Sequence, residues 1–258
     1  MSLRLSPNLP ALNDRIAAAT HLFVFSDLDG TLAPIADRPA EVRLPPKAKT
    51  ILVELTRRPN TTVAILSGRS LIDVKERVDV PGLILAGNHG LEIEGPDFHH
   101  TNSTALALQD RMAALAAVLN GRLRQVPGAW VENKMLSLSV HTRHVADRDM
   151  QRLLDALLFS LSDFLPFIEL TAGIMVFEVR PRVDWTKGDA AVWIRNRIET
   201  PRPLTIFIGD DLTDEDGFRL LPDGINVKVG HGTKTLAAYT VENFQEVASF
   251  LRWVSEIK

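Results

Sequence analysis

Three short runs of apolar residues, each followed at once by a cluster of polar residues, constrain the fold of this chain most strongly. The runs are Leu22–Phe25, Thr62–Leu66 and Leu204–Ile208. Unbroken apolar runs of this length are typical of strands that are buried on both faces, as in a parallel sheet covered by helices. Helical segments alternate with the runs, so the pattern predicts an α/β fold with a doubly wound, Rossmann-like parallel sheet.

Two segments carry the clearest helical signals. In residues 46–57 the apolar side chains recur at helical spacing, at Ala48, Ile51, Leu52 and Leu55. In residues 185–198, Thr186 is expected to cap the helix with Asp189 three residues later. The predicted apolar stripe of this second helix is Ala190, Trp193, Ile194 and Ile198.

The middle of the chain has a different pattern. Alternating strands and short connections there predict an antiparallel sheet with one open face. The expected elements are helices over Ser103–Leu119 and Asp147–Ser162 and strands over Leu136–Val140, Phe167–Leu170 and Ile174–Val179, the last two joined by Thr171–Gly173. We therefore expect an α+β cap domain over residues 96–183, inserted between core segments 1–95 and 184–258.

Composition excludes several classes of protein. The 258 residues include no cysteine, which excludes thiolate zinc sites, disulfides and a cysteine nucleophile. A net charge of −3 gives no basic surface for nucleic acid, and the apolar runs are too short to span a bilayer. We expect a cytoplasmic protein without nucleic-acid or membrane partners; its oligomeric state is open, with a monomer favoured.

Polar residues are concentrated where the three runs end, and after the first and third runs most of them are acidic. The clusters are Ser26–Thr31, Ser67–Arg69 and Gly209–Asp216. The carboxyl ends of parallel strands meet at one edge of the sheet, where ligands of α/β folds bind. The carboxylates expected there are Asp27, Asp29, Asp210, Asp211 and Asp214. Such crowding of like charges is relieved by a hard cation, and carboxylates together with a phosphate suit Mg²⁺.

Each of these signals has an ordinary explanation when it stands alone. Asp-x-Asp-Gly is usually a turn, and a calcium loop is excluded because Leu32 stands where that loop needs glycine and Arg38 where it needs glutamate. Lys187 could be a surface lysine, and the acids after Ile208 could favour a helix start. The order of the signals, each after an apolar run, favours a common site for Mg²⁺ and a phosphate.

The motifs resemble a known enzyme superfamily. Asp27–Thr31, Ser67, Lys187 and Gly209–Asp214 are similar, in this order, to the four motifs of the haloacid dehalogenase superfamily. Further segments resemble the trehalose-6-phosphate phosphatase family, namely Leu66–Arg69, Ala86–Gly90, Glu132–Lys134, His141–Arg143, Glu178–Pro181 and Asp210–Asp216. The resemblance implies Mg²⁺-dependent hydrolysis of trehalose 6-phosphate through an aspartyl-phosphate.

The resemblance also implies roles for the core residues. Asp27 would be the nucleophile and Asp29 the general acid and base, with Lys187 and Asp214 completing the catalytic group. The phosphate would contact Thr31, Ser67, Gly68 and Lys187. Mg²⁺ would be held by Asp27, the backbone of Asp29, and Asp210, with Asp211 or Asp214 in support.

A further set of residues is expected to contact the sugar. By resemblance these are Arg69, Asn88, His89, Glu132, Lys134, His141, Arg143 and Glu178. Parity along the predicted strands places Ser139, His141 and Glu178 on a polar sheet face, which could equally be a solvated face. Thr142 departs from the family pattern, which has an aromatic residue between His141 and Arg143.

Three other functions stay open. The substrate could be another sugar phosphate, such as sucrose phosphate or glucosylglycerol phosphate. A non-catalytic sugar-phosphate sensor is disfavoured because Asp27 and Lys187 are both present. A phosphotransferase would share the aspartyl-phosphate.

Overall fold

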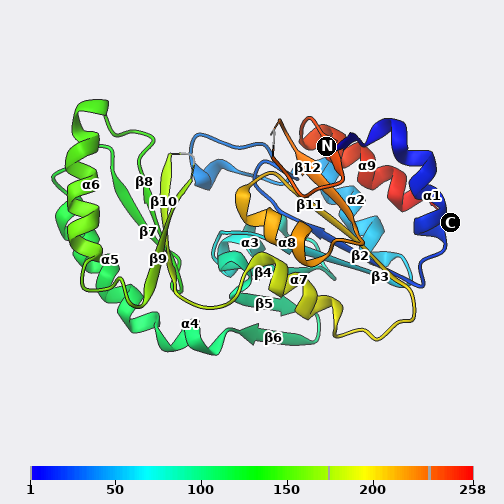
Figure 1. Ribbon diagram of the computed structural model, residues 1–258, viewed down its shortest axis with the longest axis horizontal. Helices are drawn as coiled ribbons and strands as arrows, with labels where there is room; N and C mark the ends of the chain where they lie inside the picture. The colour runs from blue at the N-terminus through cyan, green and yellow to red at the C-terminus, as the bar shows by residue number, and fades with distance from the viewer. Residues whose placement is uncertain (1, 174, 232–233, 258) are drawn as a thin grey trace. The chain divides into compact units, whose positions relative to one another are not determined.

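The computed structural model describes residues 2–173, 175–231 and 234–257 (Figure 1). Contacts divide the chain into two compact units, the first made of residues 1–100 and 185–258 and the second of residues 101–184. The sequence-based boundaries at 95/96 and 183/184 therefore lie within a few residues of the contact-based ones, and strand β6 (Phe98–Thr101) belongs to the sheet of the first unit.

The first unit is built on a largely parallel sheet. Among the described residues its strand order is β1 (Leu3–Arg4), β13 (Tyr239–Val241), β12 (Ile225–Val229), β11 (Pro203–Gly209), β2 (His21–Ser26), β3 (Thr61–Leu66), β4 (Ile84–Gly87), β5 (Glu92–Gly95) and β6. Pairing is parallel from β1 to β4 and antiparallel between β4 and β5. The three predicted apolar runs are β2, β3 and β11, which are adjacent.

Helices cover both faces of this sheet, as the doubly wound fold predicts. Alternate residues of β2 point to opposite faces, so Leu22 and Val24 join one buried cluster and Phe23 and Phe25 the other. The first cluster packs against α1 (Leu9–Ala17), α2 (Pro46–Arg57), α3 (Leu71–Val78) and α9 (Phe244–Glu256). The second packs against α7 (Lys187–Arg195) and α8 (Glu215–Leu220).

The two predicted helices of the core differ in how well their ends were placed. The bounds of α2 and its four buried apolar residues are as predicted. Helix α7 starts after the predicted cap Thr186, whose capping box with Asp189 is present. It ends at Arg195, so Ile198 lies beyond the helix and is 37% exposed, and its place in the apolar stripe was wrong.

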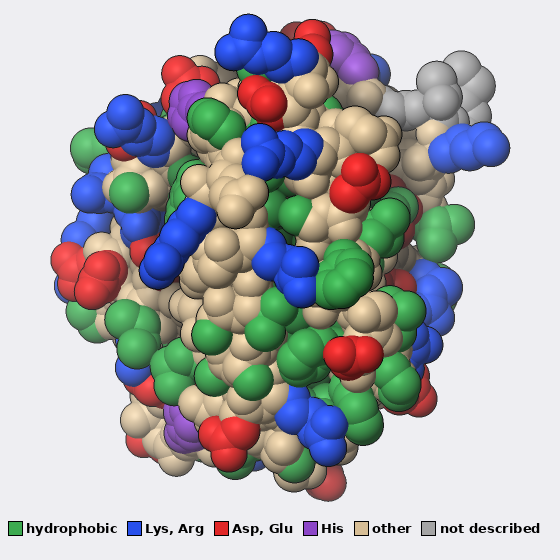
Figure 2. All heavy atoms as spheres, turned by 90° about the vertical axis from the view of Figure 1, so that its left-hand side faces the viewer, with side chains coloured by type: hydrophobic (Ala, Val, Ile, Leu, Met, Phe, Trp, Pro, Cys, Tyr) green, Lys and Arg blue, Asp and Glu red, His purple; other side chains and the backbone are tan. Residues whose placement is uncertain are grey.

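The second unit is an antiparallel sheet with helices on one face. Its strand order is β7 (Trp130–Asn133), β8 (Leu138–His141), β10 (Val176–Pro181) and β9 (Ile168–Gly173). Leu138, Val140 and Val179 share a buried cluster with α5 (Gln109–Leu123) and α6 (Asp147–Leu161). Figure 2 looks at the helical side of this unit, where hydrophobic side chains are interspersed with charged ones.

Three expectations for this unit were wrong in detail. The helix predicted over 103–119 is two helices, α4 (Ser103–Ala107) and α5, because the backbone leaves the regular helix at Leu108. Strand β8 begins at Leu138, since a turn with positive φ at Met135 precedes it. Thr171–Gly173 form the end of β9 rather than a connection, and Ile174 lies outside the described residues.

No helix that lies within the described ranges combines the length and the apolar character needed to span a membrane.

Candidate active site

The polar ends of β2 and β11 are joined through the backbone. The two strands run parallel in register, and the Asp27 N–H continues the pairing by donating to the Ile208 carbonyl at 2.9 Å. The loops that follow, Ser26–Thr31 and Gly209–Asp216, therefore lie side by side at one edge of the sheet, as the sequence predicted.

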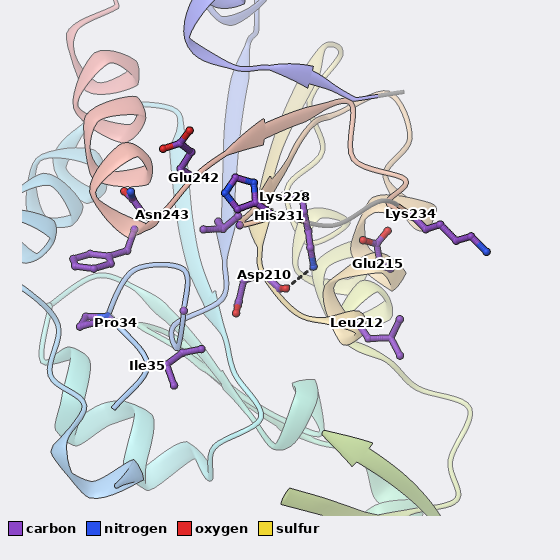
Figure 3. Close-up of a pocket in the computed structure, with 14 residues that line it drawn as sticks. Pro34, Ile35, Asp210, Leu212, Glu215, Lys228, His231, Lys234, Glu242 and Asn243 are labelled. Atoms are coloured by element: carbon purple, nitrogen blue, oxygen red, sulfur yellow. Dashed lines mark hydrogen bonds between the residues drawn. The ribbon is translucent and has the colours of Figure 1, made fainter. Parts of the chain in front are cut away.

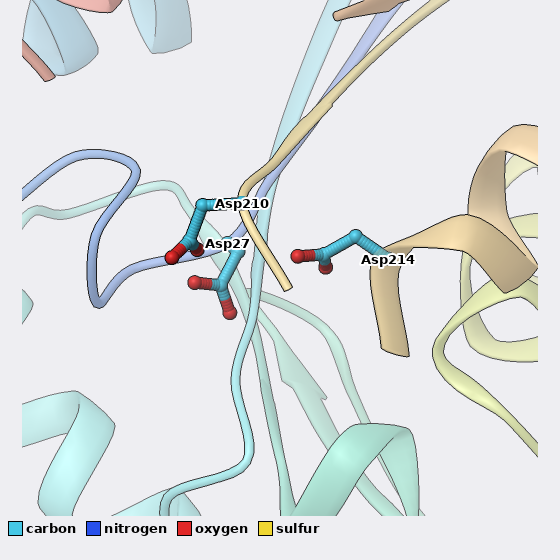
Figure 4. A group of neighbouring side chains, drawn as sticks. All are labelled: Asp27, Asp210 and Asp214. Carbon is cyan, nitrogen blue, oxygen red and sulfur yellow. The ribbon is translucent and has the colours of Figure 1, made fainter. Parts of the chain in front are cut away.

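Three carboxylates converge between these loops. Asp27, Asp210 and Asp214 each offer an oxygen, and these atoms lie within 4.8 Å of one another (Figure 4). Gly30, at φ +82°, lets Asp210 approach, because a Cβ there would lie 2.2 Å from an Asp210 carboxylate oxygen. Thr31 donates its hydroxyl to Asp210 Oδ1 at 3.0 Å.

One lysine contacts this acidic cluster. Lys187 Nζ lies 2.6 Å from Asp27 Oδ1 and 3.0 Å from Asp214 Oδ1, and its side chain is 3% exposed. It is the first residue of α7 and follows the N-cap Thr186, which forms a capping box with Asp189. The cap fixes where the helix begins and thereby where the ammonium enters the cluster.

Burial makes the ionised carboxylates costly. Burial raises the pKa of Asp27 well above its ordinary value; the Lys187 ammonium opposes this effect and Asp214 adds to it. Burial, followed by the charge of Asp214, raises the pKa of Asp210 to about 6. Burial by itself would lower the pKa of Lys187, but the carboxylates of Asp214 and Asp27 outweigh it and raise that pKa above its usual range.

The donor set fits a hard divalent cation. Three carboxylates face one ammonium, which leaves a surplus of buried negative charge, and all the ligand atoms are oxygens. Asp211 is not part of this group: its side chain is exposed and accepts the Leu212 N–H at 2.6 Å. Of the two residues that the sequence left open, the geometry favours Asp214.

Asp29 is held apart from the acidic cluster by an arginine. Arg69 Nε lies 2.7 Å from Asp29 Oδ2, and its Nη2 lies 2.6 Å from Oδ1. Arg69 also donates to Asp73 at 2.6 Å, and Asp73 accepts from Arg77. Burial raises the pKa of Asp73, but hydrogen bonds from Arg77 and Arg69 outweigh this effect and hold it below its ordinary value.

The loops after β3 and β4 form a second group beside Arg69. Ser67 is buried, and its backbone carbonyl accepts the His89 N–H at 2.9 Å. The His89 ring packs against Gly68, where an added Cβ would lie 2.7 Å from the ring. The Asn88 amide donates to Glu92 at 2.7 Å. The structure therefore brings Ser67, Gly68, Arg69, Asn88 and His89 together.

In the second unit, the predicted polar face carries a network of its own. Glu178 accepts from Ser139 at 2.7 Å and pairs with Lys134 at 3.3 Å. Glu132 pairs with His141 Nε2 at 2.8 Å, on the sheet face opposite the helices. Arg143, which was expected to contact the sugar, lies outside this network and is exposed in the turn after β8. Its neighbour Thr142 is buried and donates its N–H to the Met175 carbonyl.

Sequence reasoning missed two features of the core. It did not pair Arg69 with Asp29, although the spacing of four residues between Arg69, just before α3, and Asp73, in its first turn, was a local signal for an ion pair there. It also passed over Lys228, a charged residue in the strand beside β11. Lys228 donates to the backbone of the loop that carries Asp210.

Comparison with known proteins identifies relatives. Residues 25–245 match the family model described as trehalose-phosphatase. A trehalose-phosphate phosphatase of Mycobacterium marinum is 37% identical over 236 residues, covering 88% of this chain and 60% of that protein. An uncharacterized glycosyl hydrolase of Mycobacterium tuberculosis is 39% identical over 239 residues, covering 88% of this chain but 18% of that protein. The chain thus spans less than two thirds of these relatives.

Solved structures share the fold. The C-terminal domain of a Candida albicans trehalose-6-phosphate phosphatase superposes with a TM-score of 0.81 at 22% identity, covering 100% of both chains. A trehalose-6-phosphate phosphatase related protein superposes with a TM-score of 0.80 at 23% identity, covering 90% of this chain and 96% of that one. These matches confirm the predicted α/β fold class.

Proposed function

The chain belongs to the trehalose-phosphatase family, and from this premise we propose that it hydrolyses trehalose 6-phosphate to trehalose and phosphate. The observation that carries the proposal is the cluster of buried Asp27 and Asp214 and half-buried Asp210 around Lys187, at the carboxyl ends of β2 and β11. A surplus of buried carboxylates is costly for stability and favours a role in chemistry.

Asp27 acts as the nucleophile. One of its carboxylate oxygens attacks phosphorus, a bond forms between them, and the bond from phosphorus to the sugar oxygen breaks. Water then attacks the phosphorus of the aspartyl-phosphate, which releases phosphate and restores Asp27. Lys187, Thr31, Ser67 and the backbone at Gly68 hold the phosphoryl oxygens during both steps.

Asp29 acts as the general acid and base. It gives a proton to the departing sugar oxygen and takes one from the attacking water. In this structure both carboxyl oxygens of Asp29 accept hydrogen bonds from Arg69, and this contact must be given up before one of them can donate to the sugar oxygen. Asp29 therefore leaves Arg69 before the first step, and the freed guanidinium becomes available to the substrate.

The donor set of the acidic cluster suits Mg²⁺. Asp27, Asp210, Asp214 and the backbone carbonyl of Asp29 would hold it, with Asp211 as the alternative that the exposed position of its side chain disfavours. When bound, Mg²⁺ neutralises charge between the anionic nucleophile and the anionic phosphate.

The second unit serves as a cap that selects the sugar. On its polar face, Glu132, Lys134, His141 and Glu178 offer charged donors and acceptors, which form strong hydrogen bonds with sugar hydroxyls. Asn88, His89 and Arg143 complete the proposed sugar contacts. We include in the proposal that the protein is cytoplasmic and monomeric.

Phosphate release from a panel of sugar phosphates tests the proposal. The panel comprises trehalose 6-phosphate, sucrose phosphate, glucosylglycerol phosphate and glucose 6-phosphate, each with Mg²⁺ and with a chelator. We expect trehalose 6-phosphate to give the highest kcat/KM, and activity to require Mg²⁺. A higher kcat/KM for another sugar phosphate of the panel would make that compound the substrate instead. Transfer of phosphate to a sugar acceptor would indicate a phosphotransferase.

A sensor is distinguished by a second measurement. Tight binding of trehalose 6-phosphate without release of phosphate, by a protein that binds Mg²⁺, would refute catalysis. The Asp27→Asn variant provides the blank for the release assay.

A further inference from the structure

Lys228 lies on β12 beside the acidic cluster. The strand has the sequence Ile-Asn-Val-Lys-Val, and its register pairs Lys228 with Gly209, the last residue of β11. A side chain at this position stands next to the loop that carries Asp210 and Asp214. Lys228 has no role in the mechanism proposed above.

The ammonium of Lys228 contacts backbone rather than carboxylates. Nζ donates to the carbonyl oxygen of Asp210, the bond drawn in Figure 3, and to that of Asp211 at 3.3 Å. The side chain lies in the wall of a cavity of about 580 Å³, which Gly30 and Asp210 also line. Water in this cavity would compete for both carbonyls if the ammonium were removed.

The loop held by Lys228 sets the direction of two carboxylates. Asp214 Oδ2 accepts the Asp211 N–H at 3.0 Å, and Asp210 Oδ1 accepts from Thr31 at 3.0 Å. Both hydrogen bonds depend on the course of the backbone between Asp210 and Asp214. A charge-assisted hydrogen bond to two successive carbonyls is a strong restraint on that course.

A cation near a metal site has a second, opposing effect, because it repels the metal. In this structure the ammonium lies against carbonyl oxygens, which carry partial negative charge, and its hydrogen bonds are made to them rather than to the carboxylates. We therefore expect loss of the restraint to outweigh loss of the repulsion.

We propose that Lys228 is a positioning residue that holds the Asp210–Asp214 loop in the geometry that binds the divalent cation. This inference rests on the metal-dependent function proposed above. Lys228 acts through the backbone of this loop, so its side chain need not touch substrate or phosphate.

Four variants of the full chain test the inference. Lys228→Met keeps the apolar stem and removes the ammonium, Lys228→Gln keeps a neutral donor, and Lys228→Arg keeps a charged donor. Lys234→Met is the matched control, since Lys234 is an exposed lysine of the same cavity wall. Mg²⁺ affinity is measured by isothermal titration calorimetry without substrate, and the fold by circular dichroism in a chelator.

We expect Lys228→Met to weaken Mg²⁺ binding by about 10-fold or more, the range seen when groups that orient metal ligands are removed. Raising Mg²⁺ should restore most of its kcat, and KM for trehalose 6-phosphate at saturating Mg²⁺ should stay near that of the unaltered protein. Lys228→Arg should be closest to the unaltered protein, Lys228→Gln intermediate, and Lys234→Met unchanged.

Several results would overturn the inference. One is unchanged or tighter Mg²⁺ binding by folded Lys228→Met, and another is an equal loss in Lys234→Met. If Lys228→Met does not fold, equal affinities of the Arg and Gln variants would overturn it, as would absence of Mg²⁺ binding by the unaltered protein. Mg²⁺ binding without phosphatase activity would refute the proposed function alone, because the affinities are measured without substrate.

Discussion

The core and the second unit each hold a cluster of carboxylates and basic side chains, but the two clusters differ in how many basic partners the carboxylates have. In the core, Asp27, Asp210 and Asp214 face one ammonium, that of Lys187. On the polar sheet face of the second unit, Glu178 and Glu132 each have a basic partner: Glu178 pairs with Lys134, and Glu132 pairs with His141.

This difference in basic partners suits the two clusters to different kinds of ligand. Burying several carboxylates together is costly, and in the core burial, with the charge of Asp214 adding to it, raises the pKa of Asp27 and Asp210. A cation would relieve that cost. In the second unit each of these carboxylates has a basic hydrogen-bond partner, and the remaining donor and acceptor positions suit neutral hydroxyls. Four experiments should show the different roles of the two clusters, and they follow from the largest expected effect to the smallest.

Asp27→Asn should abolish activity while the protein stays folded. Loss of the nucleophile should lower kcat by more than about 1,000-fold. Because the change also removes one of the surplus carboxylates, the melting temperature in a chelator should stay the same or rise by a few degrees. Phosphate release and thermal unfolding check the two parts, and a clear loss of stability would contradict the account of surplus charge.

Asp214→Asn and Asp211→Asn should differ strongly, although the residues are three apart. Asp214 joins the acidic cluster and contacts Lys187, so its change should lower activity and Mg²⁺ affinity by about 100-fold. The exposed Asp211 only caps the next residues, and an asparagine keeps that role. Calorimetry and kinetics on both variants decide which residue supports the metal; equal losses would restore Asp211 as a ligand.

The stability of the metal-free protein should increase as pH falls from 7.5 to 5. Burial, followed by Asp214, raises the pKa of Asp210 to about 6, above its unfolded value. The folded state therefore binds the proton more tightly, and this stabilisation is lost as pH rises through 6. The expected change is on the order of 1–3 kcal/mol in the free energy of unfolding.

Urea unfolding in a chelator at several pH values measures this effect. Asp210→Asn should flatten the difference, and Mg²⁺ should stabilise the unaltered protein more at pH 7.5 than at pH 5. An identical pH profile for Asp210→Asn would show that other groups are responsible.

The smallest effect on activity is expected from changes on the polar sheet face of the second unit. Glu178→Gln should raise KM for trehalose 6-phosphate by about 10-fold and leave kcat and Mg²⁺ affinity nearly unchanged, because the residue contributes to binding of the sugar alone. Asp155→Asn, an exposed carboxylate on α6, is the control. A fall in kcat with unchanged KM would place Glu178 in the chemical step instead.

Local patterns in the sequence predicted much of the core. The apolar runs identified β2, β3 and β11, and helical spacing gave the bounds of α2. The capping box at Thr186 was legible because it joins residues three apart. Where the local signal was weak, as at the break in the helix at Leu108, the prediction was wrong.

The amino-acid sequence by itself determined that polar residues, many of them acidic, follow three buried strands, because apolar runs and the residues that end them are local properties of the chain. Only the tertiary structure decided which side chains meet. It placed Asp214 rather than Asp211 in the acidic cluster, paired Asp29 with Arg69, and set Lys228 against the backbone of the acidic loop. Pairs so far apart in sequence depend on strand register and on the direction of each side chain, and neither is encoded within a single segment.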